Sequence, residues 1–137
     1  AASVLSGTLF ASDALAQKGF SKVVTDPTRW ATVEYANQQE CSGTPEDCAL
    51  KMLGAMNISV GDDPAFSVYR LGETEDKYVT VVFVSHLVED DDSVLGELYR
   101  LELSQAGIAD ESFSLNGVGK MYQCMEGRVG WRKTECP

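Results

Sequence analysis

The chain has a single histidine and lacks the short motifs that mark many nucleophilic, zinc-dependent and phosphate-binding sites. None of GxSxG, HExxH or GxxxxGK[ST] occurs in its 137 residues. The histidine, His86, has Ser85 beside it, but neighbouring residues of a strand point to opposite faces. We therefore expect no enzymatic activity and no cofactor. A small hydrolase that uses His86 with neighbouring acids is an alternative.

Basic residues are few and form no cluster. The chain has 11 Lys and Arg against 21 Asp and Glu, which gives a formal net charge of −10. Proteins that bind nucleic acid or anionic membrane surfaces present concentrated positive charge. We expect neither kind of partner, and no small-molecule ligand is indicated. A protein partner is the expectation that the composition leaves.

The four cysteines lack the CxxC spacing and the additional histidines that are typical of a zinc site. They form two pairs that are close in the sequence, and each disulfide would close a short loop. Four cysteines allow three connectivities, of which we predict Cys41–Cys48 and Cys124–Cys136. Chain-entropy arithmetic gives about 2.5 and 3 kcal/mol of stabilisation for the two loops.

The N-terminal segment differs from the rest of the chain. Residues 1–16 contain no Lys or Arg and end in Ala-Leu-Ala, the small-x-small pattern that precedes a signal-peptidase cleavage site. We interpret 1–16 as a residual signal peptide or N-terminal anchor segment, with an ordinary helix as the alternative. Residues 17–137 have the length of one domain. With the disulfides, this predicts a bacterial periplasmic or secreted protein.

Two helices are expected in the N-terminal half. An Asp-Pro pair predicts a helix start at residue 26, although a strand through 30–35 is possible. A Thr-Pro-Glu-Asp run at 44–47 predicts the second helix. Its apolar stripe consists of Cys48, Ala49, Met52, Leu53 and Met56.

The apolar period changes to two after residue 64, which indicates strands. Four strands are predicted, over 65–71, 77–87, 94–104 and 113–125. Their short polar connections favour an antiparallel meander. The predicted fold class is therefore α+β, with two N-terminal helices packed on a four-stranded antiparallel meander sheet and two disulfides.

The register of the middle strands follows from placing their apolar residues on one face. We expect Phe83 opposite Tyr99 and Val81 opposite Leu101, which places His86 beside Gly96.

Glu97 is anomalous because this register places it on the apolar face. We expect it at a bulge or paired with Arg100 or Arg128. Glu97 and Glu102 could in principle form the carboxylate pair of a glycosidase, but we interpret Glu97 as a structural feature.

A run of acids, 89–92, lies between the second and third predicted strands. Glu89, Asp90 and Asp92 are weak candidates for metal ligands. Consecutive residues of an extended chain point in alternating directions, so few of them could converge on one ion. We favour a solvated turn and expect no metal ion.

The loop that the second disulfide would close contains one Trp and three basic residues. Trp and Arg are frequent anchors at protein interfaces. We expect the binding surface to combine this loop with the outer face of the sheet. Its candidate residues are His86, Arg100, Arg128, Trp131 and Arg132.

A longer pattern supports export. Asp91-Asp92-Ser93-Val94, Tyr99-Arg100-Leu101-Glu102-Leu103, Cys124, Gly127-Arg128, Trp131 and Cys136 follow one another in the C-terminal half. This pattern resembles that of small exported bacterial proteins of unknown function. The resemblance implies export and a paired C-terminal disulfide, and it implies no activity.

Together these features predict an exported, non-enzymatic binding or accessory protein of the bacterial cell envelope, for example a subunit of a membrane-associated complex. An inhibitor of a secreted hydrolase, such as a lysozyme or a protease, is the alternative, since an acidic protein complements a cationic enzyme.

Overall fold

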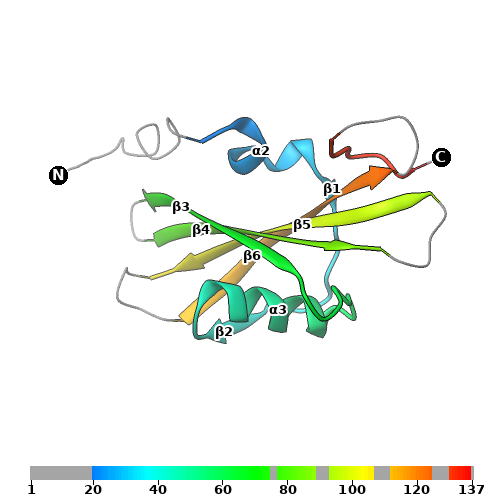
Figure 1. Ribbon diagram of the computed structural model, residues 1–137. Helices are drawn as coiled ribbons and strands as arrows, with labels where there is room; N and C mark the ends of the chain where they lie inside the picture. The colour runs from blue at the N-terminus through cyan, green and yellow to red at the C-terminus, as the bar shows by residue number, and fades with distance from the viewer. Residues whose placement is uncertain (1–19, 75–76, 89–92, 107–111, 125–129, 137) are drawn as a thin grey trace.

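The computed structural model describes residues 20–74, 77–88, 93–106, 112–124 and 130–136 (Figure 1). The predicted segment 1–16 lies outside these ranges. So do Arg128 and the weak metal candidates Glu89, Asp90 and Asp92.

The fold is α+β, with one antiparallel sheet and short helices on both of its faces. In chain order the elements are α2 (Lys22–Thr25), the 3-10 turn η1 (Pro27–Arg29), β1 (Ala31–Thr32), β2 (Glu40–Ser42), α3 (Pro45–Ala55), β3 (Ala65–Thr74), β4 (Lys77–Leu87), β5 (Val94–Gln105) and β6 (Ser112–Cys124). The strands lie in the order β1-β6-β5-β4-β3, and β2 also pairs with β6.

The predicted meander is confirmed, but the sheet has six strands and not four. β3 to β6 follow one another as the expected antiparallel meander. β1 and β2 add to the outer edge of β6, where they pair with different parts of that strand. With two and three residues, they are too short to show a period of two in the sequence.

The expected first helix is wrong beyond its first turn. Asp26 caps as predicted, because its side chain accepts a hydrogen bond from the Thr28 backbone N–H at 3.0 Å. The helical turn ends at Arg29, and the chain then extends into β1. Extension lets Trp30 lie against the sheet, with 2% of its surface exposed. Burying this large side chain outweighs the local helical preference.

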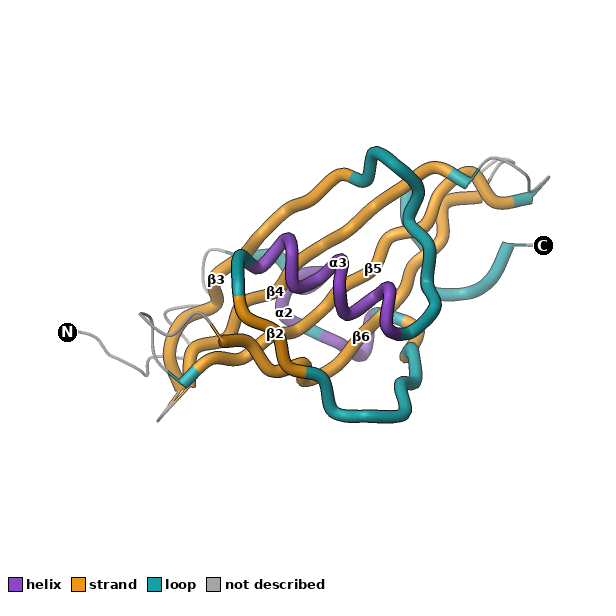
Figure 2. The backbone as a smooth tube through the Cα atoms, turned by 90° about the horizontal axis from the view of Figure 1, so that it is seen from below, coloured by secondary structure: helices purple, strands orange, loops and turns teal. Residues whose placement is uncertain are grey.

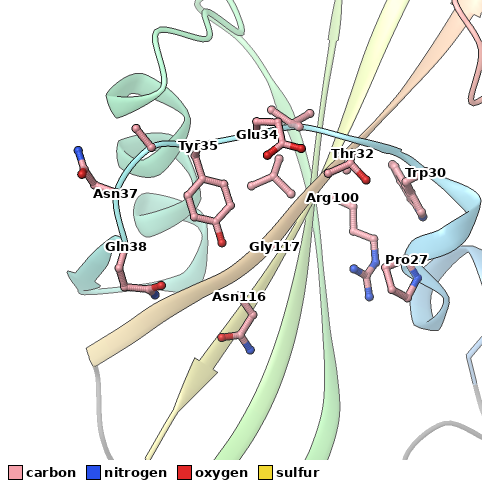
Figure 3. A pocket seen from close by; sticks show the side chains of 14 residues that line it. Pro27, Trp30, Thr32, Glu34, Tyr35, Asn37, Gln38, Arg100, Asn116 and Gly117 are labelled. Atoms are coloured by element: carbon pink, nitrogen blue, oxygen red, sulfur yellow. The ribbon is translucent and has the colours of Figure 1, made fainter.

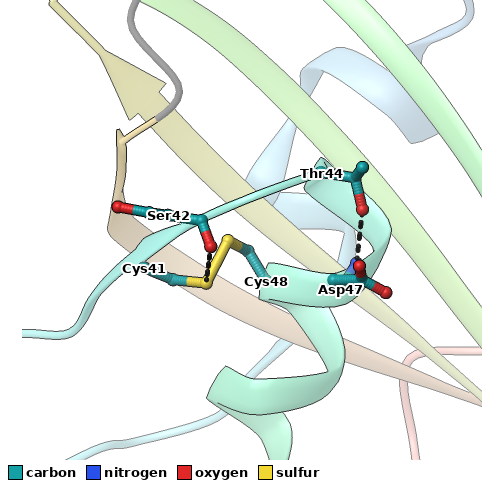
Figure 4. Close-up of a disulfide and its surroundings, with 5 residues drawn as sticks. All are labelled: Cys41, Ser42, Thr44, Asp47 and Cys48. Carbon is teal, nitrogen blue, oxygen red and sulfur yellow. Dashed lines mark hydrogen bonds between the residues drawn. A yellow bond between two sulfur atoms is a disulfide. The ribbon is translucent and has the colours of Figure 1, made fainter.

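The second helix is confirmed as α3. The Thr44 hydroxyl accepts a hydrogen bond from the Asp47 backbone N–H at 3.1 Å, and Pro45 occupies the first turn. The Cys41–Cys48 disulfide links β2 to this turn (Figure 4). The second predicted disulfide, Cys124–Cys136, is also present. Disulfides are typical of an oxidising, extracytoplasmic environment.

Both faces of the sheet are covered. Figure 1 shows α2 above the sheet and α3 below it, and Figure 2 shows α3 crossing the lower face. Val82 and Val84 pack in the core against α3, whereas Val81 packs with Val24 of α2. The interior strand β4 is therefore apolar on both sides.

This double covering explains why the predicted register is wrong by one residue. Tyr99 lies opposite Val84 and not Phe83, and Leu101 lies opposite Val82. A run that is apolar on both faces carries no signal that distinguishes one parity from the other.

The covering of the upper face depends on a close approach of Trp30 to the backbone of β6. A Cβ atom added to Gly119 would lie 2.5 Å from the Trp30 Cβ, far inside normal contact. The indole N–H of Trp30 donates a hydrogen bond to the Val23 carbonyl at 2.9 Å. Only glycine at position 119 leaves room for this arrangement.

We predict that Gly119→Ala lowers the free energy of unfolding by about 1–3 kcal/mol, because the new methyl group must displace Trp30. Gly117→Ala is the matched control, since a Cβ there meets nothing within 4 Å. Urea denaturation of both variants measures the difference. Equal stability of the two variants would contradict the role given to the Trp30 contact.

Candidate functional site

The residues predicted to form one binding surface lie in separate places. His86 pairs with Glu97 across β4 and β5, on the α3 face. Arg100 lies on the opposite face, with only 3% of its surface exposed. Trp131 and Arg132 lie in the tail, defined here as residues 130–136. Arg132 donates two hydrogen bonds to the Thr134 hydroxyl.

Glu97 is the centre of a half-buried polar group on the α3 face, which we call the Glu97 cluster. Its carboxylate accepts hydrogen bonds from Lys120 Nζ at 2.8 Å, His86 Nε2 at 2.9 Å and the Tyr99 hydroxyl at 3.2 Å. Glu97 therefore does lie on the apolar face of β5, as the sequence indicated. Its partners are these three groups and not Arg100, which pairs with Glu102 at 3.1 Å.

The cluster shifts the pKa values of its members. Burial acts to raise the pKa of Glu97, but the hydrogen bond and charge of Lys120 outweigh it and hold that pKa below its usual value. Burial and then the Glu97 charge raise the pKa of Tyr99 to about 12. The pKa of Lys120 is raised: burial opposes the shift, and the hydrogen bond to Glu97 overcomes it. An ionised carboxylate that accepts three hydrogen bonds is suited to holding three side chains in place.

Arg100 joins the two layers of the upper face. Its Nε donates a hydrogen bond to the Val24 carbonyl at 2.9 Å, and Nη2 bonds to Glu102. The guanidinium group therefore attaches α2 to the sheet, and its remaining side borders a pocket.

That pocket is formed by the chain between β1 and β2. Residues 33–39, which we call the strap, leave the edge of β6 and return to it. The strap, β6 and Arg100 enclose about 530 Å³, and Figure 3 shows side chains converging from all three. This volume is within the range of small-molecule sites. We call it the strap pocket.

Hydrogen bonds at both ends hold the strap in place. The Val33 N–H donates to the Val118 carbonyl at 2.9 Å, and the Leu115 N–H donates to the Gln39 carbonyl at 3.0 Å. Between them, the side chain of Gln38 donates to the Leu115 carbonyl at 2.8 Å. The pocket is therefore preformed.

A third feature is a group of exposed apolar side chains where β4 ends and β5 begins. Leu87, Leu95 and Trp131 expose 71%, 37% and 40% of their surfaces. Leu87 pairs with Gly96, and the Trp131 ring lies 3.4 Å from where a Gly96 Cβ would be. Leu87 and Trp131 therefore lie side by side at one end of the sheet, and we call these two side chains the hairpin–tail patch. Leu95 precedes Gly96 in β5, where neighbouring residues point to opposite faces.

The strap pocket was not predicted from the sequence. The pocket brings the 32–38 region next to β6, which lies about eighty positions later in the sequence. β1 and β2 are too short for their pairing with β6 to be predicted from the sequence. Trp131 of the hairpin–tail patch was predicted as a binding residue, whereas Leu87 was not. The two glycines of β6 beside the strap, Gly117 and Gly119, were the available signal for a pocket.

In the described ranges, no three His, Cys, Asp or Glu residues are arranged to hold a metal ion. None of the helices in the described part of the chain is long and apolar enough to cross a membrane. Comparison of the chain with profiles of known families, with curated proteins and with solved structures finds no match.

We predict that Glu97→Gln destabilises the fold at neutral pH by about 1–3 kcal/mol, because Lys120 loses its charged partner. The folded-state pKa of Glu97 lies below its usual 4.5, so its contribution is complete above that pH and is lost as the pH falls through the folded-state value. The stability gap between the two proteins should therefore shrink on acidification.

The measurement is denaturant unfolding at a series of pH values, from neutral pH down to below the folded-state pKa of Glu97. Glu40→Gln, a change at an exposed residue of β2, is the control and should leave the profile unchanged. A gap between wild type and Glu97→Gln that persists in acid would contradict the assignment.

Proposed function

We propose that this protein is a non-enzymatic binding protein that acts outside the cytoplasm, in the bacterial periplasm or after secretion. It binds a partner protein through the hairpin–tail patch. The observation that carries this proposal is that the exposed side chains of Leu87 and Trp131 lie side by side next to Gly96, at one end of the sheet. Exposed apolar side chains that cluster mark interaction surfaces, whereas scattered ones do not.

The position of Trp131 is consistent with an anchor residue. Its ring lies against Gly96, since a Cβ at 96 would be 3.4 Å from the ring, an ordinary contact distance. Directly opposite residues of an antiparallel pair have side chains about 5 Å apart, so Leu87, opposite Gly96, lies beside Trp131. A tryptophan next to an exposed leucine has the composition of an interface hot spot.

The tail that carries Trp131 is held on both sides. Arg132 and Tyr122 exchange two backbone hydrogen bonds, of 2.7 and 2.8 Å. The Cys124–Cys136 disulfide closes the segment, and Lys133 donates to the Thr28 carbonyl at 3.0 Å. A partner would therefore meet an ordered surface, which reduces the entropy lost on binding.

Charge favours a protein over a lipid surface as the partner. The chain has a net charge of −10, and residues 89–92, close to Leu87 in sequence, are all acidic. An anionic membrane would repel this end of the molecule, whereas a cationic protein would be attracted. A subunit of an envelope complex and a secreted lysozyme or protease both fit this description.

We predict that Trp131→Ala and Leu87→Ala each weaken capture of a stoichiometric partner from envelope extracts by at least about tenfold, as expected at a hot spot. Leu50→Ala is the matched control, because Leu50 is 36% exposed but lies on α3. Quantitative mass spectrometry of the bound fraction measures the loss, and circular dichroism confirms that each variant is folded.

A partner captured equally by all four proteins would refute the patch as the binding surface. Inhibition assays against lysozymes and proteases then separate the two classes of partner: inhibition that disappears in Leu87→Ala identifies an inhibitor, and capture without inhibition identifies an accessory subunit.

A further inference from the structure

We infer that the strap pocket is a second binding site, and that it takes an uncharged, polyhydroxylated ligand of the saccharide class. None of the residues that line it belongs to the hairpin–tail patch. The inference is therefore independent of the partner protein proposed above.

The pocket has an open floor made of main chain. Gly117 and Gly119 of β6 line it; Trp30 covers Gly119, whereas a Cβ at Gly117 would meet nothing within 4 Å. A ligand can therefore approach the backbone at this point, as is common where glycines replace larger residues in a strand.

Arg100 supplies fixed donors at one side. Its guanidinium carries five N–H groups, and the bonds to Val24 and Glu102 use two of them. Within the described part of the chain the other three N–H groups have no hydrogen-bond partner, and the side chain borders the pocket. Because Arg100 is 97% buried and bonded from two directions, these donors are oriented before any ligand binds.

Side-chain amides supply donors and acceptors that carry no charge. The Asn116 Oδ1 atom accepts from the Ser104 hydroxyl at 3.2 Å, which leaves the amide N–H groups of Asn116 for a ligand. Gln38 has the opposite arrangement: its Nε2 is used by Leu115, and its carbonyl oxygen is left as an acceptor. Sugar hydroxyl groups both donate and accept, and so match a site that offers both.

The charges of the pocket oppose an anionic ligand. Glu102 already neutralises Arg100 at 3.1 Å, and the other charged side chain that lines the pocket, Glu34, is negative. Bound anions would be repelled by these carboxylates. A carboxylate can still accept hydrogen bonds from neutral hydroxyl groups, and such charge-assisted bonds are strong.

An extended peptide fits this site less well than a saccharide. Peptides that add to a sheet need free backbone groups along a strand edge. At this edge of β6 the Leu115 N–H and the Val118 carbonyl are already bonded to the strap. The groups left free are side chains, together with the partly buried ring of Tyr35, which can pack against the C–H face of a sugar.

The test uses the full chain with Trp131→Phe, which leaves Trp30, a pocket residue, as the sole tryptophan. Its fluorescence and the amide chemical shifts of Gly117 and Gly119 are followed during titration. The neutral probes are maltose, cellobiose and N,N′-diacetylchitobiose, and the charged probes are inorganic phosphate and glycine. We expect at least one neutral disaccharide to bind at millimolar concentration or below and the charged probes to have no effect.

Glu34→Ala should weaken that binding by about tenfold or more, because it removes a charged acceptor from an exposed part of the strap. Glu40→Ala, an exposed change outside the pocket, should leave it unchanged. Lack of response to all three disaccharides, a response to the charged probes alone, or binding unaffected by Glu34→Ala would each overturn the inference.

Discussion

The packing of Trp30 on Gly119 organises the upper face of the sheet. The indole needs a glycine beneath it, and its N–H bonds to Val23, so the N-terminal segment is attached where it reaches β6. Arg100 makes a second attachment through the Val24 carbonyl. Once this segment is held, the chain continues along β6 as β1 and then as the strap. The strap pocket is thus a consequence of how the upper face is covered.

The lower face is organised differently. α3 is joined to β2 by the Cys41–Cys48 disulfide and covers the apolar part of this face with its buried stripe. The remaining part carries the Glu97 cluster, where a half-buried carboxylate is neutralised by Lys120. A buried charge is tolerated only with such partners. The polar group therefore completes the covering of a face that the helix does not fully span.

The parts of the fold that were predictable are those with strong local signals. The second helix had a cap, a first-turn proline and a stripe, and the four meander strands were apolar runs separated by short polar connections. The disulfide pairs followed from short spacings. Export and a protein partner stay predictions.

The failures all concern long-range packing. Trp30 turned an expected helix into a strand. Covering of both faces hid the parity of β4. Glu97 was recognised as anomalous, but its pairing with Lys120 depends on the alignment of β5 with β6, so Arg100 and Arg128 were expected instead. The strap pocket has the same origin, because its parts come from opposite ends of the sequence.

The strap pocket and the hairpin–tail patch approach each other at η1. Pro27 lines the pocket, and the next residue, Thr28, accepts a hydrogen bond from Lys133 of the tail. One exposed hydrogen bond contributes on the order of 1 kcal/mol. The tail is held more firmly by its disulfide and by its pairing with Tyr122. Because neither of these contacts involves the strap, occupation of the pocket has little means of moving Trp131, and the two surfaces are built to bind independently.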